Sequence, residues 1–360
     1  MTRRLFSVLV VLAAVFAAAA IAVTVERQGA TASETKPEIV FPGLTARLND
    51  VMKIVAVRDG ESATLVRKGT GEDAPWFLVE AGNYPGKIDR IRQALIGMGA
   101  LETIEPKTKL PNHYAKLQVE DPSKKGSKSG RITLYDSAGK VMADLIVGKP
   151  KFSPSGIDAI YIRRPNEDRA WLARGRVDVP ESRYGWVDTN VLTVDLRRMK
   201  KATLNEPGKP PLTVYKNKPD DRDFTVADQP SGTDIKDIFG AEDIARTVQS
   251  VNFAAVKPAS EMAIPTEGKP WGEFWTFDGL MISVYMKDEN GKGWVAFVAS
   301  PAEDAKADDK VKIEIADINK RLSPWRFELG DFEYKELHKT MQDLVEPKQA
   351  AADQPAPKTK

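Results

Sequence analysis

The sequence predicts an α+β protein, in which an N-terminal transmembrane helix precedes two related lobes of antiparallel strands with one main helix each. Three observations predict this class. An uncharged apolar stretch lies near the start, short runs of alternating apolar and polar residues follow, and one order of strands, helix and hairpin occurs twice. Strands grouped in hairpins with helices between them are typical of antiparallel sheets in α+β proteins.

The first element is the apolar segment of residues 5–25, which carries no charge before Glu26. As a helix it spans about 30 Å, the thickness of the hydrocarbon core of a bilayer. The apolar regions of signal peptides have only about 7 to 15 residues, so we expect residues 1–25 to be a retained membrane anchor. Small residues around Ala20 and Ala22 leave open the alternative of a cleaved signal.

Charge around this segment predicts the topology. Arg3 and Arg4 precede it, and positively charged residues stay on the cytoplasmic side of a membrane. The predicted localisation is therefore the inner membrane, single-pass, with a cytoplasmic N-terminus and a periplasmic body. Residues 26–40 are small and polar and predict a tether, and residues 347–360 are too poor in apolar residues to fold and predict a disordered tail.

The body divides into residues 41–190 and residues 191–346, and the second half predicts an internal repeat of the first. Alternating residues broken by turn signals predict the opening strands of each half. These are MKIVAVRDGESATLVRKG and PWFLVE in the first half, and MKKATLNEPGKPPLTVYKN and DFTVAD in the second. In this correspondence Phe224 stands in the place of Phe77.

A helix follows these strands in each half. Apolar residues recur there at helical spacing, which predicts a helix face packed on the core. The stripes consist of Ile88, Ile91, Leu95 and Met98 in the first half, and of Ile244, Val248 and Val251 in the second.

The hairpin after each helix is the best match between the halves. Each match has a strand, a turn that ends in Gly-Lys, and a second strand, namely RITLYDSAGKVMADLIVG and MISVYMKDENGKGWVAFVAS. We therefore expect Ile132 and Tyr135 to correspond to Ile282 and Tyr285. The first half adds strands within residues 159–175, whereas the second ends in a strand and an amphipathic C-terminal helix.

These segments resemble the bacterial family of domain of unknown function 4340 (DUF4340). The likeness covers roughly residues 44–204 and lies in WFLVE, GALETIEP, YAKLQVEDP, RITLYDSAGKVMADLIVGK, AIYIRRPNEDRAWLA and VDVP. The resemblance implies a single-anchor envelope protein, in a setting near ABC-type transport complexes or gliding-motility auxiliary proteins. It carries no catalytic residue over to this chain.

Composition excludes several kinds of site. Cysteine is absent, which excludes disulfides, thiolate metal sites and cysteine nucleophiles. Lys plus Arg number 53 against 51 Asp plus Glu, so no basic excess indicates a nucleic-acid partner. The two histidines are His113 and His338. We expect His113 to be a turn residue and His338 a solvated surface residue, neither of them beside a metal or a nucleophile.

Catalytic motifs are also missing from the sequence. No G-x-S-x-G or S-x-x-K pattern lies near partners that would complete a site. The segment GKPKFSPSG at residues 148–156 lacks the spacing of a phosphate loop and predicts an ordinary loop. The acidic pairs Asp220-Asp221 and Glu242-Asp243 fit a turn and the first turn of a helix. We therefore predict no enzyme, no cofactor and no metal site.

One aromatic cluster, WGEFWTF, has two interpretations. Trp271, Glu273 and Trp275 alternate along it and share one face of a predicted strand. Aromatic side chains around a polar group favour a partner or ligand surface, and packing of a strand on the core is the other interpretation.

The sequence thus predicts a non-enzymatic, membrane-anchored accessory or scaffold protein of the envelope. Its partner would be another envelope protein, and the family resemblance points to ABC transporter components. Two alternatives remain open: a periplasmic ligand-binding module with a cleft between the two lobes, and a carboxylate-based glycan hydrolase.

Overall fold

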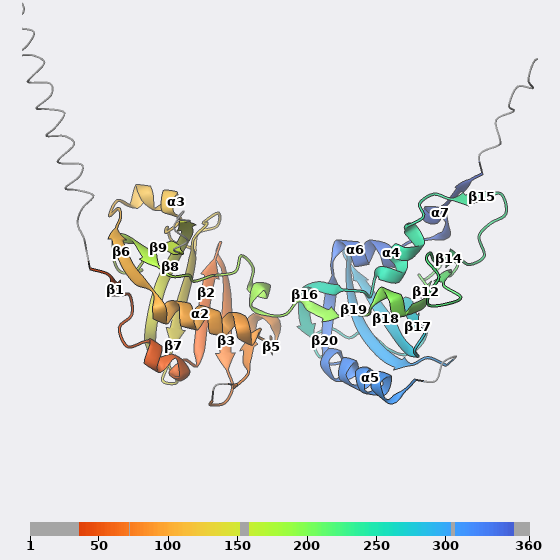
Figure 1. The fold of residues 1–360 in the computed structure, drawn as a ribbon, viewed down its shortest axis with the longest axis horizontal. Helices are drawn as coiled ribbons and strands as arrows, with labels where there is room; N and C mark the ends of the chain where they lie inside the picture. Colours follow the sequence, from red (N-terminus) through yellow and green to blue (C-terminus); the bar gives the residue numbers. More distant parts are fainter. Residues whose placement is uncertain (1–35, 72, 152–157, 304–306, 349–360) are drawn as a thin grey trace, which may run out of the picture. The chain divides into compact units, whose positions relative to one another are not determined.

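The computed structural model describes residues 36–71, 73–151, 158–303 and 307–348 (Figure 1). The predicted membrane segment and residues 349–360 of the predicted tail lie outside these ranges, whereas Pro347, which was also assigned to the tail, ends a short strand. Within them, no helix combines the length and the apolar character needed to cross a membrane. The membrane anchor stays a prediction.

The chain divides into two compact units. The first contains the chain up to Phe77 together with Lys87–Trp186, and the second contains Leu78–Gly86 and the chain from Val187 onward. Each unit contributes one large sheet in which neighbouring strands pair antiparallel, as in β2 with β7 and β12 with β17. The predicted α+β class with antiparallel sheets is therefore confirmed.

The strands of the first sheet are β1 (Glu38–Ile39), β2 (Lys53–Arg58), β3 (Glu61–Arg67), β4 (Trp76–Leu78), β5 (Tyr84–Pro85), β6 (Glu102–Pro106), β7 (Gly130–Tyr135), β8 (Val141–Lys151), β9 (Ala159–Arg163) and β10 (Ala170–Arg174). They lie in the order β1-β6-β10-β9-β8-β7-β2-β3-β4-β5. The helices are α2 (Ile88–Ala100) and α3 (Tyr114–Leu117), with 3₁₀ turns at Thr45–Asp50, Val79–Ala81, Pro111–His113 and Arg183–Trp186.

The strands of the second sheet are β11 (Asn190–Leu192), β12 (Met199–Leu204), β13 (Leu212–Tyr215), β14 (Thr225–Val226), β16 (Val251–Pro258), β17 (Gly272–Thr276), β18 (Leu280–Glu289), β19 (Lys292–Pro301) and β20 (Trp325–Leu329). They lie in the order β11-β16-β20-β19-β18-β17-β12-β13-β14, and β15 (Thr233–Ile235) pairs separately with β21 (Val345–Pro347). The helices are α4 (Gly240–Arg246), α5 (Asp309–Leu322), α6 (Asp331–Leu337) and α7 (Met341–Leu344), with a 3₁₀ turn at Leu196–Arg198.

The two sheets have the same strand order once β5 is set aside. Strands β6, β10, β9, β8, β7, β2, β3 and β4 stand where β16, β20, β19, β18, β17, β12, β13 and β14 stand in the second sheet. The order along the chain is also the same.

The predicted match of hairpins is wrong by one strand. Ile132 and Tyr135 lie in β7, whereas Ile282 and Tyr285 lie in β18, which takes the position of β8. The true counterpart of β7 is β17, the aromatic strand WGEFWTF. The physical reason is that alternating residues and a Gly-Lys turn describe any half-buried hairpin, so they do not fix which hairpin corresponds to which.

Lysines stacked on aromatic rings support this corrected match. Lys53 of β2 lies 4.1 Å from the ring centroid of Tyr135 on β7, and Lys201 of β12 lies 3.7 Å from that of Trp275 on β17. The predicted match of Phe77 and Phe224 has a similar pair of contacts. Lys68 lies over Phe77 at 4.6 Å and Lys216 over Phe224 at 4.7 Å.

Helix predictions succeed in the first unit and partly fail in the second. Helix α2 lies across one face of its sheet (Figure 1) and buries Ile91, Leu95 and Met98, as predicted. Helix α4 already ends at Arg246, and Val251 begins strand β16. The longest helix of the unit, among its described residues, is α5, which the sequence analysis missed. The predicted C-terminal helix is two short helices, α6 and α7.

The other face of each sheet is covered in part by the connection that leads into a central strand. This strand is β7 in the first sheet and β17 in the second. In the first unit the connection from β6 to β7 contributes to a small core cluster of Tyr114, Val119, Ile146 and Ala170. In the second unit the connection from β16 to β17 contributes to a cluster of Met262, Ile264, Trp294 and Ala296.

The stretch Leu78–Gly86 completes the core of the second unit. The ring of Tyr84 packs edge-on against Phe253 at 5.4 Å, Trp325 at 4.8 Å and Phe327 at 6.4 Å between centroids. Aromatic pairs favour this edge-to-face geometry because the ring edge is positive and the ring face negative.

Candidate functional site

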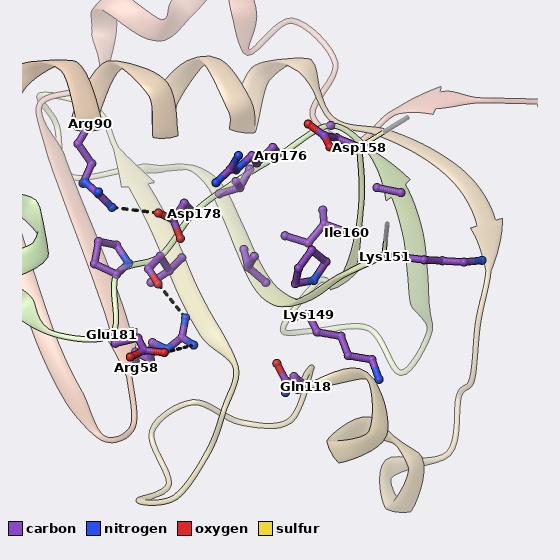
Figure 2. A pocket seen from close by; sticks show the side chains of 18 residues that line it. Arg58, Arg90, Gln118, Lys149, Lys151, Asp158, Ile160, Arg176, Asp178 and Glu181 are labelled. Atoms are coloured by element: carbon purple, nitrogen blue, oxygen red, sulfur yellow. Dashed lines mark hydrogen bonds and ion pairs between the residues drawn. The ribbon is translucent and has the colours of Figure 1, made fainter. Parts of the chain in front are cut away.

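A pocket with a volume of about 460 Å³ lies within the first unit (Figure 2). Its walls come from the ends of β8, β9 and β10 and from the stretch of residues 176–181 that follows β10. Arg58 of β2 and Arg90 of α2 complete the rim. This volume falls within the range of small-molecule and peptide-anchor sites, about 300 to 1,000 Å³.

A β-bulge shapes one wall of the pocket. Val147 pairs with Ile162 and Pro150 pairs with Ile160, so Gly148 and Lys149 oppose a single residue of β9. Bulges redirect side chains and are frequent beside functional sites. Glycine is required in this bulge, because a Cβ at Gly148 would lie 2.4 Å from the carbonyl oxygen of Leu117.

Apolar side chains form the floor of the pocket. Val147, Ile160, Val177 and Val179 line it, and each has no more than 5% of its surface exposed. A buried aliphatic floor favours a ligand group that is itself apolar, because contact removes apolar surface from water.

Basic residues outnumber acidic ones around this floor. Five basic and three acidic side chains line the pocket, namely Arg58, Arg90, Lys149, Lys151, Arg176, Asp158, Asp178 and Glu181. Arg90 pairs with Asp178 at 2.9 Å. Arg58 donates to the Val179 carbonyl at 2.8 Å and lies 3.6 Å from Glu181, as Figure 2 shows.

The other cations on the rim have no such partners. Within the described ranges, Lys149, Lys151 and Arg176 are exposed and make no hydrogen bond or ion pair with the protein. The described lining also contains no hydroxyl, thiol or imidazole side chain. An apolar floor with free cations above it is suited to bind an anionic group that carries an apolar part.

The sequence analysis missed this pocket. Its charged residues are far apart along the chain, and Gly148 and Lys149 belong to a segment that we predicted to be an ordinary loop. The structure places residues 148–151 at the end of β8, and residues 152–157 lie outside the described ranges. A bulge-forming glycine followed by lysines was the local signal available.

In the predicted surface, Glu273 and Trp275 lie on the half-buried face of β17, and Trp271, also half-buried, directly precedes the strand. Trp271 Nε1 donates to the Leu337 carbonyl at 3.0 Å, and Glu273 accepts from Asn205 Nδ2 at 3.2 Å. Glu273 and Trp275 therefore share one face of β17. The role of the three residues as a partner or ligand surface stays a prediction.

The prediction of a solvated His338 is wrong. Its ring packs 5.2 Å from Trp271 and 4.3 Å from Tyr334, and Nδ1 lies 2.7 Å from the Tyr334 carbonyl oxygen. Nε2 is 3.9 Å from Asp288, whose carboxylate also accepts from the Tyr334 hydroxyl. Packing of α6 on the sheet places the ring there, which neighbouring lysines in the sequence did not reveal. His113 ends a 3₁₀ turn, as predicted.

No cluster of three or more His, Cys, Asp or Glu side chains suited to a metal occurs in the part of the chain that the structure describes. The two acidic pairs have local roles. Asp221 accepts from the backbone N–H groups of Asn217 and Lys218 at 2.9 Å each, and Glu242 pairs with Arg246 on α4.

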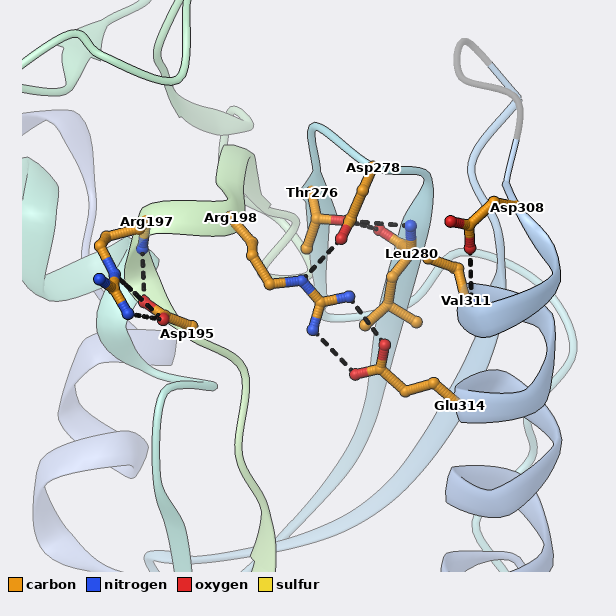
Figure 3. Close-up of polar contacts among 9 residues, drawn as sticks. All are labelled: Asp195, Arg197, Arg198, Thr276, Asp278, Leu280, Asp308, Val311 and Glu314. Carbon is orange, nitrogen blue, oxygen red and sulfur yellow. Dashed lines mark hydrogen bonds and ion pairs between the residues drawn. The ribbon is translucent and has the colours of Figure 1, made fainter.

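A second polar cluster surrounds Arg198 in the second unit (Figure 3). Arg198 donates to Asp278 at 2.8 Å and to both carboxylate oxygens of Glu314. The buried Thr276 hydroxyl donates to Asp278 and accepts from the Leu280 N–H at 2.9 Å. These ion pairs hold the pKa of Arg198 above its usual value despite partial burial. Since every charge has its partner, the cluster fits a structural role.

Comparison with known proteins gives one family. A family model described as "Domain of unknown function (DUF4340)" matches residues 76–266. No curated protein matches the chain. Among solved structures, the crystal structure of the Borreliella burgdorferi PlzA protein in complex with c-di-GMP shows 12% identity, with 82% of this chain and 98% of that chain covered. Its TM-score of 0.12 carries no argument about fold or ligand.

Proposed function

Because the chain belongs to the DUF4340 family, we propose that it is a non-enzymatic, membrane-anchored accessory protein of the bacterial envelope that binds another envelope protein through its first unit. The observation that supports binding is the pocket with an apolar floor and the free cations Lys149, Lys151 and Arg176. Such a site attracts an anionic group and buries its apolar part, and it needs no catalytic side chain to do so.

The location in the envelope is supported by the N-terminal segment. Residues 5–25 are long and apolar enough for a membrane helix, and Arg3 and Arg4 favour a cytoplasmic N-terminus. The folded units then lie in the periplasm, where an anchored protein meets other membrane components. The resemblance to proteins near ABC-type transport complexes suggests a transport complex as the partner.

Fractionation tests the location. We expect full-length protein in the membrane fraction, with units that are digested when protease is added to spheroplasts. A soluble periplasmic form that starts after Ala20 or Ala22 would replace the anchor by a cleaved signal. Protection from the added protease would overturn export.

Cross-linking in cells tests the binding site. A photoreactive amino acid at Arg176 places the probe on the pocket rim, and the same amino acid at Lys116, exposed on α3 and outside the lining, is the matched control. We expect an adduct with an envelope membrane protein from position 176, and loss of that adduct when Lys149→Glu is added. Equal adducts from both positions would overturn the assignment of the pocket.

The volume of the pocket also favours a second candidate, a periplasmic module that binds a small organic anion. This candidate differs from the sequence-based alternative of a cleft between lobes, because the pocket lies within one unit. An extract of small molecules that raises the melting temperature of the wild-type protein, but not of Arg176→Glu, would favour it over a protein partner.

A further inference from the structure

Two glycines begin corresponding strands of the two sheets. Gly130 of β7 pairs with Arg58 of β2 on one side and with Val147 of β8 on the other. Gly272 of β17 likewise pairs with the last residue of β12 and with Val284 of β18. Each glycine thus begins its strand, so the end of the first sheet that carries the pocket corresponds to the end of the second sheet that carries Gly272.

In each unit, the chain that follows β10 or β20 packs on this glycine. A Cβ at Gly130 would lie 2.7 Å from Val179, and a Cβ at Gly272 would lie 3.0 Å from Leu337. Val179 follows β10 and Leu337 follows β20, which occupy the same place in their sheets. Val179 and Leu337 thus lie in corresponding segments of the two units.

The chain around these counterparts differs in form. Leu337 belongs to helix α6, and Trp271 fixes that helix by donating to the Leu337 carbonyl. Tyr334 of α6 covers the start of β19, where a Cβ at Gly293 would lie 2.7 Å from its ring. In the first unit, residues 176–181 form no helix, and the strand ends beside them border the pocket.

We propose that the pocket of the first unit receives an acidic, amphipathic helical segment of the partner protein, in the place that α6 takes in the second unit. This inference rests on the proposed function and names the partner element. Helices that lay an apolar face into a groove are a common mode of protein recognition. Here the second unit provides an intramolecular example of a helix packed at this end of the sheet.

Charge and shape favour this occupant. Helix α6 has the sequence DFEYKEL, which combines three acids with Tyr334 and Leu337, whereas Phe332 is 44% exposed. The pocket offers the aliphatic floor for the apolar side chains of such a helix and the free cations Lys149, Lys151 and Arg176 for its acids. A small anion would neutralise the cations but would leave most of the buried aliphatic floor without a partner.

Peptides with the α6 sequence test the inference on the full-length, detergent-solubilised protein. The probe is a fluorescent peptide of residues 330–339, GDFEYKELHK, with a lactam between its Asp331 and Lys335 side chains to hold the helix. Both side chains are exposed on α6, so the bridge lies away from the packed face. The control peptide is linear and carries Lys335→Pro, which breaks the helix while it keeps Tyr334 and Leu337.

We expect the bridged peptide to bind the wild-type protein at least tenfold more tightly than the control peptide does. Affinity should fall at least tenfold for Arg176→Glu or Lys149→Glu protein and change less than twofold for Lys116→Glu, an exposed lysine outside the pocket. These variants change exposed side chains, so folding is retained, and circular dichroism checks this.

Two results would overturn the inference. One is equal affinity for the bridged and the proline peptides, and the other is affinity that the pocket variants leave unchanged. Complete displacement of the peptide by millimolar inorganic phosphate would likewise assign the site to small anions. If the peptide does not bind while the probe at Arg176 still captures a membrane protein, the helical partner element is refuted and the proposed function is retained. If the probe at Arg176 captures no membrane protein either, both proposals are refuted.

Discussion

The two terminal nitrogens of Arg198 donate hydrogen bonds to the two carboxylate oxygens of Glu314, at 2.9 and 2.7 Å (Figure 3). The pair joins the 3₁₀ turn before β12 to helix α5, two elements more than a hundred positions apart in the sequence. Bidentate pairs of arginine with carboxylate are strong because two charged hydrogen bonds form in one fixed geometry. The contact therefore holds α5 on its sheet.

Arg198→Ala should lower the free energy of unfolding by about 1–3 kcal/mol, because Glu314 and Asp278 lose their shared cation. The matched control is Arg197→Ala. Arg197 is its neighbour, 90% exposed, and pairs only with Asp195 among the ion pairs of the described residues. We expect the control to change stability by less than about 0.5 kcal/mol. Urea unfolding measures both, and equal losses would contradict the structural role of Arg198.

Tyr84 should make the second unit sensitive to alkali. Burial and the nearby carboxylate of Asp188 raise the pKa of Tyr84 to about 12. The folded state therefore favours the neutral phenol, so this contribution to stability is complete below about pH 10 and is lost as pH rises to about 12. We expect a loss of about 2 kcal/mol over that window.

Tyr84→Phe cannot ionise and provides the comparison. Urea unfolding at pH 9, 10 and 11 should show the wild-type protein losing stability faster than the variant. Parallel losses in the two proteins would show that other groups cause the alkaline effect.

The buried Glu333 side chain should lower the free energy of unfolding at neutral pH. It is only 9% exposed on α6, and burial raises the pKa of its carboxyl group. The folded state thus favours the protonated form, and stability from this group falls as pH rises through the raised pKa. Glu333→Gln should stabilise the protein more at pH 7 than at pH 4, and Glu267→Gln, at an exposed position outside α6, is the control. Thermal unfolding at the two pH values measures this, and a larger gain at pH 4 would refute it.

Gly148→Ala should lower the free energy of unfolding by about 1–3 kcal/mol. The added methyl group would lie 2.4 Å from the backbone oxygen of Leu117, so the bulge or the turn after α3 has to move. The control is Gly139→Asn in the β7–β8 turn, where φ is +76° but the space is open. Asparagine tolerates this conformation, so we expect a loss within about 0.5 kcal/mol. Similar losses in the two variants would contradict the close approach at the bulge.

Local patterns in the sequence predicted the elements better than their correspondence. The stripe of Ile91, Leu95 and Met98 predicted α2 because a helix face buried on a sheet needs that spacing. Alternation of apolar and polar residues predicted the hairpins. Neighbouring hairpins have the same alternation, so the predicted match between the halves was wrong by one strand. Strand β17 is the true counterpart of β7, but its aromatic residues favoured an interpretation as a binding surface.

Helix α5 shows how a pattern can mislead. Val311, Ile313 and Ile315 alternate as in a strand, yet Ile313 is 70% exposed in the helix. Asp308 decides the outcome, because its side chain caps the helix by accepting from the Val311 N–H at 2.9 Å. The pocket was beyond local prediction for another reason. Its charged residues come together only through the order of strands in the sheet, which no short segment encodes.

The assignment of Leu78–Gly86 to the second unit makes the order of synthesis matter. Chains emerge N-terminus first, so Tyr84 leaves the ribosome long before Phe253 and Trp325, the rings on which it packs. The core of the second unit is complete only when the segment Leu78–Gly86, which is synthesised earlier, packs against these rings. A recombination event with its crossover near Val187 would separate Leu78–Gly86 from the aromatic rings on which it packs. An intact second unit can therefore be exchanged between genes only if both coding segments are transferred together.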